Sequence, residues 1–559
     1  MSPNALLLHG GRVHVGDGRA AEAILMRDGR VAAVGDARQL RREASDAEMV
    51  DVRGGLIVPG WCDAHVHFLW WSFQMTQLDL RETRNLDEAL ASIDRFAKRL
   101  RPDAWLVGGR FDKNLWGRWP NAAELDRVSG DRPAVLRSRD GHSRWLNTHT
   151  LALAGIDATT ADPGGGRIGR DREGKPDGIL YENATRLADA VIPLPTADDC
   201  LEALRRGQQE AWRRGVVGIE DLEDAFAYQA WQRLHAGGEL GIRVAMGIPY
   251  RGPQVAARAG DRQMFASMSR NPVIEDLDRA NVSAPAHDFA TALAKAMRTG
   301  DGDAWLRIGH LKIFTDGALG SQTAALEEPY DGTSDRGILT IERAEIIDAV
   351  ARAANAGIAV AIHAIGDRAV HLALDAIEPT RASAPQLRQK VEHVQLVRED
   401  DLGRFAKLGV IASMQPIHAT SDRDLADRYW GPQRIKRAYP WRTFLTSGVV
   451  LAFGSDAPVE PIDPLLGIHA AVARRRPNDA AAWTPEQRLT VDEALAGYAS
   501  GAAYALGREH EAGTLTVGMM ADATVLDRDI TRVKEQELLD ARVRATITGG
   551  VVRYSDGVG

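Results

Sequence analysis

Eight short apolar runs, most of them followed by a longer stretch of helical character, dominate the middle of this 559-residue chain. The stretches at 342–357 and 398–409 repeat apolar residues at the spacing of amphipathic helices. Strands that alternate with helices form parallel sheets, and eight such units favour a closed (β/α)8 barrel over an open sheet. The predicted strands are 60–68, 216–222, 242–250, 309–317, 358–367, 390–396, 410–416 and 450–459. We therefore predict an α/β fold of the TIM-barrel type, with the barrel over residues 59–505.

The interval between the first and second predicted strands is too long for a single crossover. It covers residues 69–210 and contains strand-like runs of its own at 104–111 and 133–141. A segment of this size can fold as a separate unit. Because it follows strand 1 at the carboxyl end of the barrel, we expect an inserted subdomain over 69–210 that covers the active site.

Both ends of the chain have the pattern of short β-strands with glycine turns. Residue pairs that favour hairpin turns stand at Gly10-Gly11 and Asp28-Gly29, and turns are also expected at Gly549-Gly550 and Asp556-Gly557. Chain termini often lie close together in space. We therefore expect residues 1–58 and 506–559 to form the two parts of one small β-sandwich domain.

Composition and charge restrict the function classes. Hydrophobic residues make up 44% and charged residues 26% of the chain, as in an ordinary globular protein. The net charge is −8, and basic residues form no stripe along the sequence, so no nucleic-acid partner is expected. No apolar stretch reaches the roughly 18 residues of a membrane helix, and the N-terminus does not have the pattern of a signal peptide. Because two cysteines, Cys62 and Cys200, make no disulfide framework, we expect a cytoplasmic protein without a membrane partner, with a homodimer as the default assembly.

Side chains that can bind metals recur at the carboxyl ends of the predicted strands. They are His65 and His67 on strand 1, Lys312 on strand 4, His363 on strand 5, His393 on strand 6 and Asp456 on strand 8. His65 and His67 point to the same side because side chains alternate along a strand. Barrel enzymes carry their chemistry at this edge, and imidazole and carboxylate groups suit zinc and similar ions. The set predicts a divalent-metal site.

Each of these residues alone also fits a structural role. A histidine on a buried strand usually belongs to the core, a strand lysine to an ion pair, and an aspartate after Gly-Ser to a helix N-cap. Six such residues at one edge are much harder to assign to these roles. The pattern as a whole therefore favours metal binding.

Three further features have two interpretations each. His142 is either a loop histidine or a substrate contact. Asp316 either orients a metal ligand or starts a turn. Four tryptophans either line an apolar pocket or pack the insertion; they are Trp70, Trp71, Trp116 and Trp119.

Several motifs follow one another in a fixed order along the chain. They are PGWCDAHVHF (59–68), SRDGHSRWLNTHTLALAGI (138–156), GGRIGRDREGKPDGILYENA (165–184), LKIFTDGALGSQTAAL (311–326), IHAIGDRAV (362–370), EHVQ (392–395), GSDAPVEPIDPL (454–465) and GTLTVGMMADATVLD (513–527). In this order they resemble the amidohydrolase superfamily, and within it the branch of YtcJ-type proteins and N-substituted formamide deformylase. The resemblance covers nearly the whole chain.

The resemblance implies two divalent metal ions, with zinc as the first expectation. The implied ligands are His65, His67 and Asp456 for the first ion and His363 and His393 for the second, with Lys312 between them. A protonated lysine has no lone pair to offer a metal. Lys312 would therefore be carboxylated on its amine, which gives an anionic group that bridges the ions.

The resemblance also implies a hydrolytic mechanism. A metal pair lowers the pKa of a bound water, which can then attack a substrate carbonyl. Asp456 would take the proton of this water and pass it to the departing nitrogen. The second ion and His142 would stabilise the oxyanion.

We therefore expect a hydrolase of carbon–nitrogen bonds other than peptide bonds, acting on a small N-acyl or N-formyl amide. The same machinery also serves ester, carbamate or lactam hydrolysis. A mononuclear deaminase is a second alternative, but deaminases of this superfamily pair the strand-5 histidine with a glutamate three residues later, where this chain has Gly366. A non-catalytic binding protein on the same scaffold is a third, and such a protein would be expected to lose some of the six residues.

Overall fold

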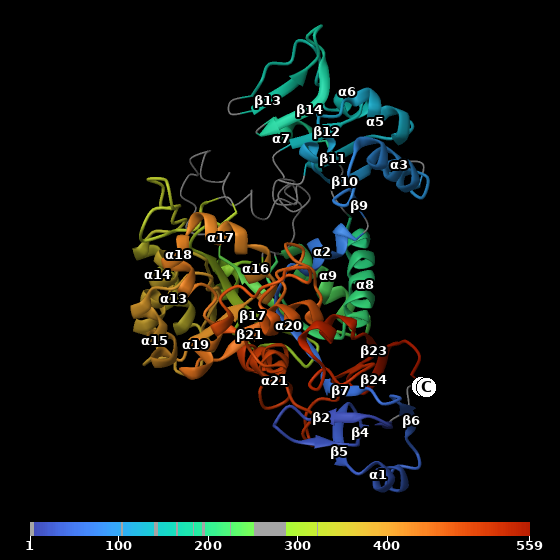
Figure 1. The fold of residues 1–559 in the computed structure, drawn as a ribbon, viewed down its shortest axis with the longest axis vertical. Coiled ribbons are helices and arrows are strands. Elements are labelled where there is room, and N and C mark those ends of the chain that lie inside the picture. Colours follow the sequence, from blue (N-terminus) through green and yellow to red (C-terminus); the bar gives the residue numbers. More distant parts are fainter. Residues whose placement is uncertain are drawn as a thin grey trace. The chain divides into compact units, whose positions relative to one another are not determined.

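The computed structural model describes residues 5–558 except 76, 102–103, 139–142, 164–165, 183, 190, 193–195, 224, 251–286 and 321. These residues fall into two units (Figure 1). The first unit contains the barrel and both chain ends, and the second lies within residues 70–203. In the described part of the chain, no helix is long and apolar enough to cross a membrane.

The eight predicted barrel strands are present and pair in sequence order. They are β8 (Trp61–Val66), β15 (Val216–Asp221), β16 (Arg243–Pro249), β17 (Leu306–Phe314), β18 (Val360–Ala364), β19 (Lys390–His393), β20 (Ile411–Met414) and β21 (Leu451–Phe453). All neighbours are parallel. The segment after β21 returns to β8, where the Asp456 N–H donates to the His65 carbonyl at 2.7 Å and the His67 N–H donates to the Ala457 carbonyl at 2.8 Å. The predicted (β/α)8 barrel is thus confirmed.

Helices follow the strands of the barrel along the chain. They include α8 (Ala197–Arg213), α9 (Ala225–Ala236), α12 (Phe289–Ala294), α13 (Arg343–Asn355), α14 (Asp367–Ile377), α15 (Glu399–Leu408), α19 (Trp441–Thr446) and α20 (Pro464–Ala473). The predicted helices 342–357 and 398–409 correspond to α13 and α15. In α13, Ile346, Ala349 and Val350 are buried at helical spacing. This apolar stripe shares one core cluster with Val360 and Ile362 of β18, which explains how the helix packs on the barrel.

The two chain ends form one β-domain of two sheets, as predicted (Figure 1, blue and red strands). One sheet has the order β5 (Arg30–Gly35), β4 (Ala23–Arg27), β1 (Ala5–His9), β6 (Glu48–Asp51). The other has the order β24 (Val551–Ser555), β23 (Val543–Thr548), β22 (Ala523–Leu526), β7 (Leu56–Pro59), β2 (Arg12–His14), β3 (Ala20–Ala21). The antiparallel pair β22 and β7 joins the two ends of the chain, and both sheets contribute to one apolar core.

One of the two predicted hairpin turns and the predicted turn at Gly549-Gly550 are present. Asp28-Gly29 joins β4 to β5 and Gly549-Gly550 joins β23 to β24, both with positive φ angles. Gly10-Gly11 instead connects β1 to β2, which lie in different sheets, so the prediction of a hairpin there was wrong.

The second unit is built on a mixed sheet. The order is β13 (Gly166–Arg170), β14 (Pro176–Glu182), β12 (Ser143–Leu146), β11 (Ala134–Ser138), β10 (Leu106–Phe111), β9 (Leu78–Asp79), accompanied by α3 (Leu86–Ala97), α5 (Ala122–Ser129) and α6 (Thr148–Leu153). Trp116 stacks on Phe111 at 5.2 Å, and Trp119 meets Tyr181 edge-on at 5.1 Å. Both tryptophans therefore pack the unit's own core. The placement of this unit over the active site stays a prediction.

Candidate metal centre

Two histidines at the carboxyl end of β8 meet the aspartate that follows β21. The Nε2 atoms of His65 and His67 lie 3.4 and 3.3 Å from Oδ1 of Asp456. Ligand atoms around a tetrahedral ion with bonds of about 2.0–2.1 Å stand roughly 3.3–3.4 Å apart. Each of the two nitrogens is therefore as far from Oδ1 of Asp456 as two ligands of one ion are from each other, and the three ligand atoms all lie within 4.8 Å of one another.

A second group of possible ligands shares the same aspartate. One donor atom each from His393, His418 and Asp456 lies within 4.8 Å of the others, and all three residues are buried. The Nε2 atom of His418 lies 3.7 Å from Oδ2 of Asp456. Asp456 thus presents Oδ1 to His65 and His67 and Oδ2 to His418.

The sequence analysis did not single out His418. This residue lies on α16 (Pro416–Ser421), just beyond the predicted strand 410–416. It is therefore at the same edge of the barrel as the six predicted residues. A search for metal-binding side chains a few residues beyond each strand end would have found it.

The remaining predicted residues lie beside these two groups. Lys312 is buried, and its Nζ is 3.5 Å from Nε2 of His65. His363 lies next to His393, with ring centroids 4.4 Å apart, and its Nε2 is 3.2 Å from the carbonyl oxygen of Gly317. The structure thus brings all six predicted metal residues to one edge of the barrel, while His142 lies outside the described residues.

Burial sets the protonation of two of these groups. It lowers the pKa of Lys312 to about 8. Together with the charge of Lys312, it lowers the pKa of His363 to about 3. His363 is therefore a neutral imidazole near pH 7, with a lone pair available for a metal.

Hydrogen bonds orient the histidines. The Nδ1 atom of His65 lies 2.7 Å from Oε2 of Glu392, and the Nδ1 atom of His393 lies 2.8 Å from Oε1 of Gln415. In this arrangement the Nε2 atoms are left for the metal centre, as is usual for metal-bound histidines.

Asp316 lies beside His363 and anchors the loop after β18. Its carboxylate is 3.5 Å from Nε2 of His363. It also accepts backbone N–H bonds from Ile365 at 3.1 Å, Gly366 at 2.8 Å and Ala325 at 2.9 Å. Of the two interpretations of Asp316, these contacts favour the one in which it orients a ligand.

The backbone at the site is strained. His393, Val394 and Asp456 have φ angles of 70°, 47° and 57°, in the left-handed region that non-glycine residues rarely adopt. At His393 this conformation interrupts the alternation of the strand, which would place neighbouring side chains on opposite faces. Glu392 and His393 therefore both contact His65. The sequence pattern did not predict that two neighbouring residues would contact the same side chain.

A buried ionic network supports His65 from inside the barrel. Lys390 Nζ lies 2.5 Å from Oε2 of Glu220 and 2.6 Å from Oε1 of Glu392. The Nδ1 atom of His310 lies 2.6 Å from Oε1 of Glu220. All four side chains are fully buried, so each charge depends on its partners. The network holds Glu392 in the position from which it binds His65.

Comparisons with known proteins agree with this geometry. Residues 48–554 match the family model described as "Amidohydrolase family". The chain belongs to the amidohydrolase family. It is 31% identical to N-substituted formamide deformylase of Arthrobacter pascens, over 96% of this chain and 95% of that protein. It is 29% identical to the putative amidohydrolase YtcJ of Bacillus subtilis, over 98% of each.

A solved structure extends the likeness to the fold. An uncharacterized metal-dependent hydrolase from Pyrococcus furiosus superposes with a TM-score of 0.73 and 27% identity, over 94% of this chain and 100% of that chain. Together with the family match, this supports a metal-dependent hydrolase. The predicted family and its branch are thus confirmed.

Proposed function

We propose that this amidohydrolase is a binuclear metal enzyme that cleaves a non-peptide amide, an N-acyl or N-formyl compound. The observation that carries the proposal is the geometry of Asp456, whose Oδ1 faces His65 and His67 while its Oδ2 faces His418. The similarity to a formamide deformylase supports the amide class of substrate.

The donor set fits divalent ions such as zinc. His65, His67 and Asp456 would hold one ion, and His363 and His393 would contribute to the other. Bound there, two ions would lower the pKa of a water and polarise a substrate carbonyl. The protein itself supplies rigidly oriented imidazoles and an aspartate that can move a proton.

In this proposal, Asp456 moves that proton. Burial by itself raises the pKa of this carboxyl, but the adjacent His65, His67 and His393 hold it well below its usual range. The group is therefore ionised near pH 7 and can accept a proton from the attacking water. It would then donate the proton to the departing nitrogen, so that the amine leaves as a neutral product.

Lys312 is suited to form a carbamate. With a pKa of about 8, about one tenth of its amine is neutral at pH 7. The neutral amine can add to dissolved carbon dioxide, forming a C–N bond and releasing one proton. The product is a carboxylate beside His65, the kind of group that binds divalent ions.

The test is the metal content of protein purified without chelator, compared with a Lys312→Ala variant. We expect about two ions per chain in the wild type and one or fewer in the variant, because the bridging group is lost. Lys407→Ala serves as a control, since Lys407 is an exposed lysine in the last turn of α15. Equal metal content in the wild type and Lys312→Ala would contradict a role for Lys312 in the centre.

The substrate class is tested on a panel of N-formyl amines, N-acyl amines, esters, carbamates and lactams. We expect turnover of one of the two amide classes to exceed that of the matched esters. Preferential hydrolysis of an ester or a lactam by the metal-loaded enzyme would keep the metal mechanism and reject the amide proposal.

A further inference from the structure

We infer that His418 is a further metal ligand of this enzyme, which binds the same ion as His393 and Asp456. The inference rests on the proposed metal function. It adds a donor from the strand-7 side of the barrel, which the family resemblance does not imply.

The side chain of His418 is held in place by its own segment. Its backbone N–H donates to the Gln415 carbonyl, and the Asp422 N–H donates to the His418 carbonyl. The Asp422 carboxylate in turn accepts hydrogen bonds from the Tyr439 hydroxyl at 3.0 Å and Gln395 Nε2 at 2.9 Å. The same segment thus orients His393 through Gln415 and fixes His418 beside it.

Both ring nitrogens of His418 are buried without a hydrogen-bond partner among the described residues. The residue is 7% exposed, so bulk water does not replace the missing partners. Leaving a buried polar group unsatisfied is costly, and such groups usually mark a ligand or ion. The centre that His418 faces supplies the missing partner in the form of a cation.

Geometry places one of these nitrogens within the centre. The Nε2 atom lies 3.7 Å from Asp456 Oδ2, close to the separation of two ligands of one ion. The ring is nearly parallel to that of His393, at 13° and 5.9 Å between centroids. By contrast, the predicted ligand His363 already has a hydrogen-bond partner for its Nε2 atom, the backbone carbonyl of Gly317.

The test is cobalt(II) binding to metal-depleted protein, followed by equilibrium dialysis and by the visible absorption spectrum. We expect His418→Ala to weaken binding of the second ion at least about tenfold and to change the cobalt spectrum. His418→Gln, which fills similar space, gives the same result if the imidazole is the ligand. His371→Ala is the control, because His371 lies on α14 with its Nδ1 3.0 Å from Asp401.

The outcomes separate this inference from the function on which it rests. Wild-type protein that binds fewer than two ions contradicts the binuclear proposal itself. Wild-type protein that binds two ions, with His418→Gln binding both at unchanged affinity and spectrum, overturns the inference. A loss of turnover in that case assigns His418 to substrate contact instead.

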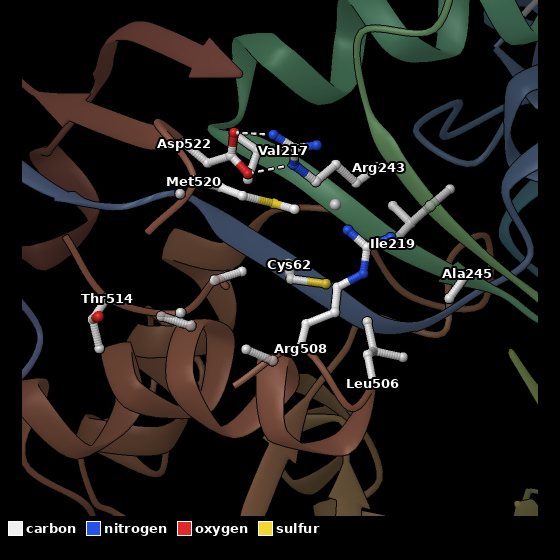
Figure 2. A pocket seen from close by; sticks show the side chains of 16 residues that line it. Cys62, Val217, Ile219, Arg243, Ala245, Leu506, Arg508, Thr514, Met520 and Asp522 are labelled. Atoms are coloured by element: carbon white, nitrogen blue, oxygen red, sulfur yellow. Dashed lines mark hydrogen bonds and ion pairs between the residues drawn. The ribbon is translucent and has the colours of Figure 1, made fainter. Parts of the chain in front are cut away.

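An independent observation concerns a cavity at the opposite end of the barrel. It has a volume of ≈ 40 Å³ and is lined by the amino ends of β8, β15 and β16 and by residues between 499 and 522 (Figure 2). We propose that it binds a small monovalent inorganic anion of the size of chloride.

The cavity contains a guanidinium that forms no ion pair of its own among the described residues. Arg508 is 4% exposed, and its Nη1 donates to the Ala304 carbonyl at 3.1 Å, while its Nη2 has no partner within the described part of the chain. The two nearby carboxylates are taken, since Asp522 pairs with Arg243 and Glu511 pairs with Arg307. Figure 2 shows Arg508 beside Cys62, which supplies no charge because burial raises the pKa of its thiol to about 12.

Charge and size together define the ligand. A buried charge without an ion pair of its own is unfavourable, so an anion bound beside Arg508 would stabilise the protein. A water needs roughly 10–15 Å³ of such space, so a cavity of ≈ 40 Å³ has room for a monatomic ion such as chloride.

The test is thermal unfolding in sodium chloride against sodium gluconate at equal ionic strength. We expect chloride to raise the Tm of the wild type by about 1–3 °C and to have no specific effect on Arg508→Met. Arg368→Met, which changes an exposed arginine, is the control and should keep the chloride-dependent rise in Tm. Bromide-soaked crystals should also show an anomalous peak beside Arg508. An equal chloride shift in Arg508→Met, or a cavity without bromide, would overturn the proposal.

Discussion

Replacing Asp456 with asparagine is expected to lower kcat/KM by about 10³-fold while leaving the fold intact. Asp456 faces both groups of histidines and is the proposed carrier of the proton. Asparagine has the same shape, but its amide nitrogen has no lone pair for a metal and does not shuttle a proton. It also tolerates the φ angle of 57° at this position, which alanine would strain.

The measurement is kcat/KM for the best amide found in the panel, together with metal content and the Tm of the same samples. Asp463→Asn is the matched control, because Asp463 caps α20 a few residues away and asparagine caps a helix equally well. This control should stay within about twofold of the wild type. If Asp456→Asn kept its metal and more than a tenth of the wild-type activity, the proposed role of Asp456 in proton transfer would be wrong.

The barrel and the six strand-end residues could be predicted because their signals are local. Each strand is a short apolar run, and the carboxyl end of each run is read directly from the chain. Since parallel strands in a barrel bring these ends to one edge, His65, Lys312 and Asp456 had to meet there.

The buried ionic network that holds Glu392 could not be predicted, because it depends on which side chains meet across the barrel. Glu220, Lys390 and Glu392 come from two strands that are far apart in the sequence. The left-handed backbone at His393 also breaks the alternation on which the prediction of side-chain direction relied. The sequence analysis did not single out His418 for a different reason: this residue lies on a helix after the strand rather than on the strand itself.

Replacing Lys390 with methionine is expected to destabilise the protein by about 3–5 kcal/mol near neutral pH. Methionine has a similar length, so the loss comes from the charge. Without Lys390, the buried carboxylates of Glu220 and Glu392 lose the cation that lies between them. Lys407→Met, at an exposed site on α15, is the control and should change stability by less than about 0.5 kcal/mol.

The pH dependence of the stability loss in Lys390→Met distinguishes a charge effect from a packing effect. In the wild type, burial alone raises the pKa of Glu220, but His310 and Lys390 lower it to about 2. The stabilisation that ionised Glu220 gains from His310 and Lys390 is therefore complete above the usual carboxyl pKa. It is lost as the pH falls toward 2. In Lys390→Met, burial and mutual repulsion raise the carboxyl pKa values instead, so mild acid relieves the penalty. The Tm difference between variant and wild type should thus shrink from pH 8 to pH 5, whereas a packing defect would leave it unchanged.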